Sequence, residues 1–374
     1  MHNKSFKVAF LGGATDFHAM DWVKSCLKAN PKNNVYVLTD LFESQGFKAD
    51  IENRIDFVKL IIIDKLLFNN QSYIAHKWRN LIKLLVLPFQ ALIVYRFSKK
   101  FPHLVFHAHS MYYLVIASMA GVKYIGTPVG SDVLLKPFTS KFFYYFASFG
   151  LKNASYLTVD SMAMVEILIS KFKYKGRIDI IQNGIDVETI SNCKFDKSTK
   201  INENYIYSIR GLAPIYQQEL LFKARNHTCQ QTPIYFSYPF VEVDYAKIIK
   251  KLSLPSDIDY GMISKGEMYE NMYHSLLVVS IPFSDSSPRS VYEAIFCGAI
   301  VAVTNTKYID QLPNCMRERL IVIDLNNPNW LKEACIKATD LKAFKFEPSQ
   351  EAILMFDQFN SYKTLEKIYD RFNV

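Results

Sequence analysis

Residues 284–298 read SDSSPRSVYEAIFCG and follow an apolar run, LLVVSIP at 276–282. Proline suits the first turn of a helix, so we expect a helix to begin near Pro288. The free backbone N–H groups at a helix start, with the positive end of the helix dipole, form a natural phosphate site. We therefore predict anion-binding chemistry at this loop, to which Arg289 can add charge.

Two acids accompany this predicted phosphate site. Asp285 precedes the helix and Glu293 lies about one turn inside it, so both carboxylates can face one ligand. A carboxylate in the first turn can instead only stabilise the helix start, by about 0.3–1 kcal/mol. Asp285 can likewise belong simply to the turn of the loop. Both interpretations remain open for both acids.

The elements that must position these residues follow a βαβ rhythm. Short apolar runs at 7–13, 34–40, 103–109, 122–130, 154–160 and 178–184 alternate with helical patterns, and a second series occupies 205–211, 233–239, 257–263, 276–282, 299–305 and 319–325. Continuous apolar strands predict parallel sheets covered by helices on both faces.

The polar stretch 192–204 reads as a surface connection between the two series. We therefore predict an α/β chain with two tandem Rossmann-like doubly wound domains, 1–190 and 191–348, facing an interdomain cleft. Residues 349–374 are expected to form a C-terminal helix that can pack back on the first domain. Doubly wound domains bind ligands beyond the carboxyl ends of their strands, so each domain would hold one substrate.

The spacing of the two acids resembles a known signature. Acid-x7-acid, followed by Ala294 and Cys297-Gly298, is similar to the E-x7-E pattern of retaining GT-B glycosyltransferases, especially glycosyltransferase family 4. Four further runs resemble that family in the same order: HAHSMYYLVIASMAGVKYIGTPVGSDV (107–133), IIQNGID (180–186), YIYSIRGLAP (205–214) and GMISKGEMYENMYHSLLVVSIP (261–282).

The resemblance implies roles for individual residues. Glu293 would bind the ribose of the donor nucleotide, Arg210 would neutralise its diphosphate, and Asp285 would approach the transferred sugar, where fixed charge stabilises an oxocarbenium-like transition state. It implies catalytic roles for Asp285 and His109, donor binding by Arg210, Gly211, Gln217, Met262, Ile263, Ser286, Ser287, Arg289, Ser290 and Glu293, and acceptor binding by Gly12, Gly13, His18, Ser131 and Asp132.

Structural alternatives stand beside these roles. Arg210 can form a surface ion pair, and His109 can be a hydrogen-bonded core histidine. Asp132 can cap the helix that follows the GSD residues.

Three departures from the family pattern matter. The first acid is Asp285, one methylene shorter than the usual Glu. The lysine that follows the arginine of the GR loop is absent, and Tyr216, Gln217 and Gln218 occupy that region. Val129 stands where many members have a histidine.

The function implied is a retaining, metal-independent glycosyltransferase that uses a nucleotide-diphosphate-sugar as co-substrate and needs no cofactor or metal. The acceptor implied is a lipid-linked, lipopolysaccharide-type or capsule-type glycan at the cytoplasmic membrane face. A nucleotide-sugar 2-epimerase and a non-catalytic membrane-associated scaffold of the same fold remain alternatives. A dinucleotide-dependent oxidoreductase is disfavoured, because FLGGATDF (10–17) lacks G-x-G-x-x-G.

Charge and cysteine usage indicate the surroundings. The formal net charge of +9 lies in residues 1–190, without motifs of nucleic-acid recognition, so we expect no nucleic-acid partner. Basic residues alternate with apolar ones over 77–100, which fits either an anionic membrane surface or an ordinary amphipathic core helix.

Lys83, Pro88, Gln90 and Arg96 interrupt the apolar stretch 77–106, so we do not expect it to span a membrane. Six scattered cysteines indicate reduced thiols and no metal site. The N-terminus lacks a signal-peptide pattern. We expect a cytoplasmic protein, peripheral at the inner face of the plasma membrane.

Overall fold

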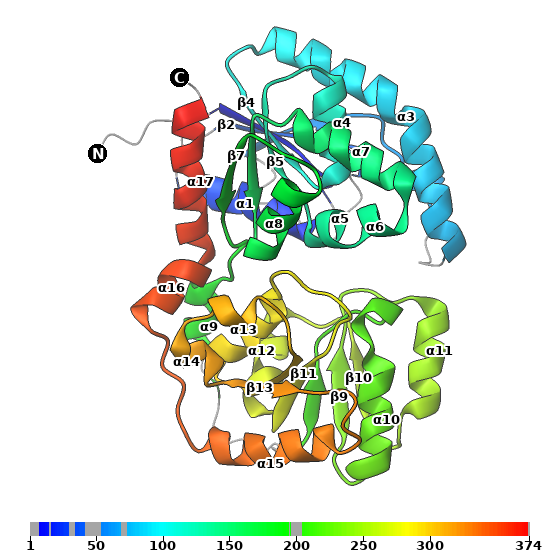
Figure 1. The fold of residues 1–374 in the computed structure, drawn as a ribbon, viewed down its shortest axis with the longest axis vertical. Coiled ribbons are helices and arrows are strands. Elements are labelled where there is room, and N and C mark those ends of the chain that lie inside the picture. Colours follow the sequence, from blue (N-terminus) through cyan, green and yellow to red (C-terminus); the bar gives the residue numbers. More distant parts are fainter. Residues whose placement is uncertain are drawn as a thin grey trace. The chain divides into compact units, whose positions relative to one another are not determined.

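The computed structural model describes residues 7–14, 16–29, 34–41, 54–68, 73–193, 195 and 204–372. The chain divides into two compact units (Figure 1). Unit 1 comprises Met1–Asn69, Tyr73–Asn183 and Gln358–Val374, and unit 2 comprises Asn70–Ser72 and Gly184–Asp357. Each unit holds one parallel sheet with helices between its strands, which confirms the predicted α/β class with two Rossmann-like domains.

The sheet of unit 1 has seven described strands in the order β3-β2-β1-β4-β5-β6-β7. They are β1 (Lys7–Leu11), β2 (Asn34–Thr39), β3 (Ile55–Lys59), β4 (Val105–His109), β5 (Tyr124–Thr127), β6 (Tyr156–Val159) and β7 (Arg177–Ile180). The edge strand β3 was not predicted, because Asp56 and Lys59 interrupt its sequence IDFVK, which is therefore not a continuous apolar run.

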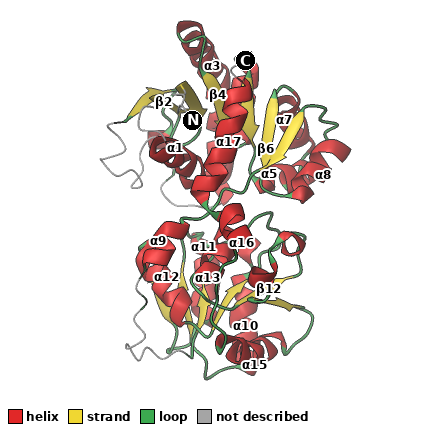
Figure 2. Cartoon of the chain, turned by 90° about the vertical axis from the view of Figure 1, so that its left-hand side faces the viewer, coloured by secondary structure: helices red, strands yellow, loops and turns green. Residues whose placement is uncertain are grey.

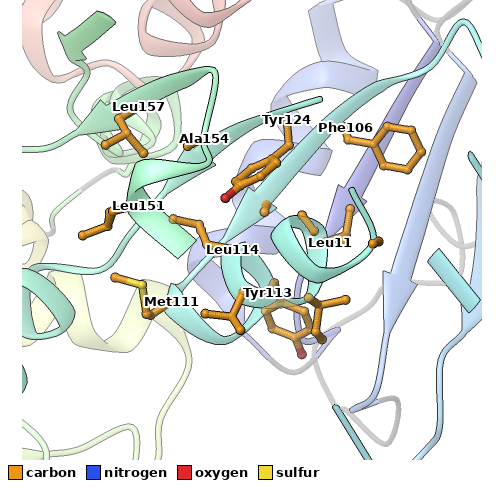
Figure 3. Packing of buried hydrophobic residues seen from close by; sticks show 14 of the residues in the cluster. Leu11, Phe106, Met111, Tyr113, Leu114, Tyr124, Leu151, Ala154 and Leu157 are labelled. Atoms are coloured by element: carbon orange, nitrogen blue, oxygen red, sulfur yellow. The ribbon is translucent and has the colours of Figure 1, made fainter. Parts of the chain in front are cut away.

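Helices cover both faces of this sheet (Figure 2). They are α1 (Phe17–Ala29), α3 (Tyr73–Lys100), α4 (Met111–Met119), α5 (Gly130–Leu134), α6 (Lys136–Thr139), α7 (Lys141–Lys152), α8 (Met162–Ser170) and α17 (Gln358–Phe372), with a 3-10 turn at Asp64–Leu66. Strand residues alternate between two cores: Ala9 and Leu11 pack with α3, α4 and α7, whereas Val8 and Phe10 pack with α1 and α17. Figure 3 shows the first core around Leu114 and Tyr124.

Unit 2 repeats this plan with six described strands in the order β10-β9-β8-β11-β12-β13. They are β8 (Ile206–Ser208), β9 (Ile234–Ser237), β10 (Ile258–Gly261), β11 (Leu277–Ser280), β12 (Val301–Thr304) and β13 (Leu320–Ile323). The helices are α9 (Val187–Asn192), α10 (Gln218–Thr228), α11 (Val243–Leu252), α12 (Lys265–His274), α13 (Arg289–Phe296), α14 (Asn314–Arg317), α15 (Trp330–Lys342) and α16 (Gln350–Phe356), with 3-10 turns at Pro214–Tyr216 and Ile309–Gln311.

The division between the units differs from the expected boundaries. Gly184–Asn192 belongs to unit 2, because Ile185 and Ile190 are buried in its core. The predicted single C-terminal helix is two helices: α16 buries Phe356 in unit 2, and α17 buries Tyr362 against α1 in unit 1. Most of the predicted linker, 192–204, lies outside the described residues.

Helix α3 carries two apolar stripes. Leu87, Ala91 and Val94 are buried in the core of unit 1. The second stripe is exposed and consists of Leu81, Leu85, Phe89, Leu92 and Tyr95. Over Lys77–Lys100, α3 is long and apolar enough by composition to cross a membrane, and only 22% of its most apolar window is buried in the protein. By length and composition alone, this segment could therefore span a membrane, contrary to the expectation from the sequence.

Candidate functional site

Two of the predicted site residues of unit 2, Arg210 and Asp285, meet beyond the carboxyl ends of β8 and β11. Nη2 of Arg210 lies 2.6 Å from Oδ2 of Asp285, and its Nε donates a 2.8 Å hydrogen bond to Oγ of Ser280. Both charged side chains are mostly buried, with 12% and 17% of their surfaces exposed. Arg210 therefore forms an ion pair, but with the other predicted site residue and not with a surface acid.

Two aromatic rings adjoin this pair. The guanidinium of Arg210 lies 5.6 Å from the ring centroid of Tyr216, which occupies the region of the missing lysine. Burial, and in addition the charge of Asp285, raises the pKa of Tyr308. Sequence reasoning missed Ser280 and Tyr308 because nothing local marks them. Ser280 ends β11 and Tyr308 follows β12, so only the parallel sheet brings them to Arg210.

Gln218 holds the loop that carries Arg210. Its amide Nε2 donates to the carbonyl oxygens of Arg210 and Gly211, at 2.5 and 3.0 Å, and its Oε1 accepts from Ser208. The predicted residue Gln217 instead joins the 3-10 turn to α10 with a φ of 51°. The structure thus gives the supporting role to Gln218, which is buried, and shows no such contact for Gln217 among the described residues.

Gly211 is required by packing. A Cβ at Gly211 would lie 2.5 Å from the ring of Phe240. The loop thus approaches an aromatic side chain of its own unit closely, and its expected approach to a diphosphate stays a prediction.

Glu293 does not cap its helix. Helix α13 begins at Arg289 after Pro288, no acid lies in its first turn, and Glu293 is in the second turn with 6% of its surface exposed. Its Oε1 accepts a 3.2 Å hydrogen bond from the hydroxyl of Tyr269 and lies 3.6 Å from Nζ of Lys265. The capping interpretation is wrong, and a buried carboxylate beside α12 remains available to a ligand hydroxyl.

The remaining donor candidates lie in two places, the loop and first turn of α13 after β11 and the segment that follows the edge strand β10. Ser286, Ser287, Arg289 and Ser290 occupy the loop and first turn of α13, and the hydroxyl of Ser287 donates to that of Tyr292. Oγ of Ser290 is buried without a hydrogen-bond partner in the described chain. Gly261 has a φ of +62°, which permits the turn before Met262. Met262 is 73% exposed, and Ile263 lines a hollow of about 180 Å³ with Tyr205 and Tyr260.

In unit 1, the predicted acceptor residues lie at the carboxyl ends of β1, β4 and β5. His109 ends β4 and is buried, with Nδ1 3.4 Å from Oδ2 of Asp16. Gly12 lets α1 approach, because a Cβ there would lie 3.1 Å from that of Ala19 and 3.9 Å from that of His109. Gly13 accepts the N–H of Asp16, and the N–H of His18 donates to Oδ1 of Asp16 at 3.0 Å.

Asp16 was not singled out from the sequence. Burial alone would raise its pKa, but contact with His109 and the charges of His109 and His18 outweigh burial and lower the pKa to about 2. The two histidines of the HAH run differ sharply. His107 bonds Tyr369 through Nδ1 and Thr127 through Nε2, and burial, with the charge of His109, lowers its pKa to about 3.

Asp132 has a structural task. Its carboxylate accepts the N–H of Met111, the first residue of α4, at 3.0 Å and lies 2.7 Å from Nζ of Lys136. It therefore does not cap its own helix but holds the start of α4. Between β4 and α4, Ser110 has a φ of 69°, a backbone conformation that costs about 1–3 kcal/mol. Asp132 thus stabilises the turn that directly follows His109. Ser131 is half-buried in α5.

A buried charged cluster adjoins this edge. Asp40, after β2, is fully buried, accepts the hydroxyl proton of Tyr113, and lies 3.3 Å from Nζ of Lys83. Burial lowers the pKa of Lys83, and burial together with Asp40 raises that of Tyr113. Lys83 therefore points into unit 1 and does not belong to a solvated basic rim of α3.

No group of three or more His, Cys, Asp or Glu side chains that could hold a metal ion occurs among the residues that the structure describes. A comparison with curated proteins gives no match. The family model of Glycosyltransferase Family 4 matches residues 68–189.

Solved structures share the fold at low sequence identity. Sucrose-phosphate synthase from Thermosynechococcus elongatus is 12% identical, with 98% of each chain covered and a TM-score of 0.76. Anabaena HepE in complex with UDP-glucose is 16% identical, with 98% of this chain and 99% of that one covered and a TM-score of 0.71. Trehalose 6-phosphate synthase from Burkholderia multivorans is 9% identical over the same shares, with a TM-score of 0.72. The family match and the shared architecture identify this chain as a GT-B fold protein that resembles glycosyltransferase family 4.

Proposed function

We propose that this chain is a retaining, metal-independent glycosyltransferase that transfers a hexose-type sugar from a nucleotide-diphosphate-sugar to a lipid-linked, lipopolysaccharide-type or capsule-type glycan. The observation that carries the proposal is the ion pair of Arg210 and Asp285 beyond the carboxyl ends of β8 and β11, together with the buried carboxylate of Glu293 in α13 of the same unit. A guanidinium suits a diphosphate, and carboxylates suit sugar and ribose hydroxyls. HepE was solved with UDP-glucose, which makes UDP-glucose the first donor to test.

The donor proposal is tested first by binding. Nucleoside diphosphates and nucleotide sugars are screened by thermal shift, because a ligand that binds only the folded chain raises its melting temperature. Arg210→Ala and Glu293→Ala are expected to abolish the shift, whereas Lys247→Ala, an exposed ion-pair residue of α11, keeps it. Equal shifts in melting temperature for the wild type and all three variants would refute the assignment of Arg210 and Glu293 to the donor site.

Turnover then distinguishes the alternatives. With donor and no acceptor, a 2-epimerase alters the sugar, whereas a transferase at most hydrolyses the donor slowly. With an acceptor panel, NMR of the product reports whether the anomeric configuration is retained, and activity in excess EDTA reports metal independence. Donor binding without transfer across the panel would favour the non-catalytic scaffold.

We propose further that α3 lies in an anionic membrane surface at the cytoplasmic face. The exposed stripe contains Leu85 at 61% and Phe89 at 62% exposure. Apart from Lys83, which points into unit 1, helix α3 has five Lys and Arg residues that are exposed or half-buried, and it has no Asp or Glu. Because Leu87, Ala91 and Val94 are packed in the core of unit 1, a lipid-facing orientation along the interface fits α3 better than a spanning one.

Vesicle flotation tests this orientation. The chain is expected to float with vesicles containing phosphatidylglycerol more than with neutral phosphatidylcholine vesicles, and Leu85→Glu with Phe89→Glu is expected to abolish flotation. Ile336→Glu, at an exposed position of α15 in unit 2, is the matched control and should float like the wild type. Equal flotation of the α3 variant and the control would refute the membrane surface on α3.

A further inference from the structure

The histidine at the end of β4 is paired with a carboxylate that no motif indicated. Nδ1 of His109 is buried and lies 3.4 Å from Oδ2 of Asp16, an ion-pair separation somewhat longer than a hydrogen bond. No described residue hydrogen-bonds Nε2 of His109. Hydrogen bonds between such partners are often long in ligand-free structures and shorten in the complex.

The companion histidine shows what a structural role looks like on the same strand. His107 is two residues earlier on the same face, and both of its ring nitrogens bond neutral hydroxyls, those of Tyr369 and Thr127. His109 has a carboxylate near Nδ1, and its Nε2 has no hydrogen-bond partner among the described residues. The partners of His107 are those of a core histidine, whereas the partners of His109 are compatible with ligand binding.

Hydrogen bonds within the turn before α1 fix Asp16 and leave its Oδ2 to face His109. Its Oδ1 accepts the N–H of His18, its own N–H donates to Gly13, and its carbonyl accepts the N–H of Met20 in α1. These bonds close the turn between β1 and α1 and aim Oδ2 at the imidazole. A carboxylate at the N-terminal end of a 13-residue helix is also stabilised as an anion by the helix dipole.

Nε2 of His109 is the ring nitrogen that could form a hydrogen bond with a ligand. A carboxylate beside Nδ1 favours the tautomer in which Nδ1 carries the proton, and Nε2 then presents a lone pair. An unprotonated ring nitrogen can accept a hydrogen bond from a hydroxyl group. It cannot donate one to a carbonyl or an ether oxygen. Such a nitrogen therefore selects a hydroxyl.

We propose that Asp16 is a positioning residue that fixes the tautomer of His109, so that Nε2 of His109 accepts the hydrogen bond of an acceptor hydroxyl. The inference rests on the proposed transferase function, since it names the group of the acceptor that unit 1 recognises. The hydrogen bond from a sugar-type hydroxyl of the acceptor to His109 would thus orient the acceptor. His109 lies next to the loop of Gly12 and Gly13. The strained turn at Ser110, held by Asp132, keeps His109 at the end of its strand.

A spectroscopic test does not depend on turnover. The full chain is labelled with 15N-histidine, and the protonation of each ring nitrogen of His109 is read from nitrogen shifts and couplings, with His109→Gln for assignment. In Asp16→Asn the amide can donate to Nδ1, so we expect the proton to move to Nε2. Asn is also a good residue at a helix start, so the variant should fold. Asp21→Asn, in the same helix, is the matched control.

Kinetics with the acceptor provide the second readout. At saturating donor, Asp16→Asn is expected to lower kcat/KM for the acceptor about a hundredfold and leave the KM for the donor unchanged, and Asp16→Glu is expected to recover part of the loss. An unchanged tautomer together with acceptor kcat/KM within twofold of Asp21→Asn would overturn the inference. If the wild type transfers no sugar, the proposed function fails, and the tautomer measurement still decides the role of Asp16.

Discussion

The ion pair between Arg210 and Asp285 makes an unusual prediction: removing an acid from the donor site should tighten the binding of a nucleoside diphosphate. In the structure the guanidinium of Arg210 is neutralised by Asp285, with Nη2 and Oδ2 2.6 Å apart. A diphosphate must therefore approach a cation that already has a partner. Asp285→Asn keeps the shape of the side chain and removes its charge.

The magnitude follows from the geometry. A phosphate bound on the open side of Arg210 would lie about 7 Å from the carboxylate, where two unit charges repel by about 1–2 kcal/mol at an effective dielectric constant of about 20–40. Each 1.4 kcal/mol is about a factor of ten in Kd, so Asp285→Asn should bind the nucleoside diphosphate about tenfold more tightly. Transfer should fall by about 10²–10³, because the charge that stabilises the sugar cation is lost.

Isothermal titration calorimetry at low salt measures the diphosphate affinity, with the nucleotide chosen by the thermal-shift screen. Asp244→Asn on α11, whose side chain is 88% exposed and paired with Lys247, controls for the change in net charge. The tightening should shrink as salt is added, because mobile ions screen the repulsion. A Kd in Asp285→Asn equal to or weaker than that of Asp244→Asn would refute the placement of the diphosphate at Arg210.

Three further predictions concern stability, each measured by urea denaturation. Asp257→Ala should cost about 3–5 kcal/mol, because it leaves the fully buried guanidinium of Arg225 without its carboxylate partner. Gly126→Ala should cost about 1–3 kcal/mol by overpacking, since the new Cβ would lie 2.9 Å from Cδ2 of Leu114. Burial lowers the pKa of His107 from 6.5 to about 3, so below pH 6.5 the unfolded chain takes up a proton that the native chain does not. Stability should be full above pH 6.5 and fall by about 1.4 kcal/mol per pH unit below it, and His107→Gln should remove this slope. A stability loss under 1 kcal/mol for either of the first two variants, or an unchanged slope in the third, would contradict the contacts on which each rests.

The sequence predicted the layout of the strands well and the tasks of single polar residues less well. The strand pattern predicted all six described strands of unit 2. Five of them lie in largely apolar runs, because a strand buried on both faces needs no alternation, whereas the edge strand β10 is mostly exposed. The search for continuous apolar runs missed β3, an edge strand whose short sequence IDFVK contains Asp56 and Lys59. The C-terminal segment read as one helix because α16 and α17 are both amphipathic, although they bury their apolar faces in different units.

The histidines and acids show the limit of local pattern. HAH places His107 and His109 on one face of β4, but only their neighbours distinguish them: Tyr369 comes from α17 and Asp16 from the turn before α1. Lys83 looked like part of a basic surface until Asp40, which follows another strand, placed it inside unit 1.

By itself, the sequence determined the α/β class, the two sheets and the strand ends at which Arg210, Asp285 and His109 stand, because these depend on the period of apolar residues along the chain. Only the tertiary structure decided which side chains meet there. The pairings of Arg210 with Asp285, of Glu293 with Tyr269 and of His109 with Asp16 join residues far apart in the sequence. Parallel sheets bring all carboxyl ends to one edge, so contacts at that edge are set by strand order, which no local pattern encodes.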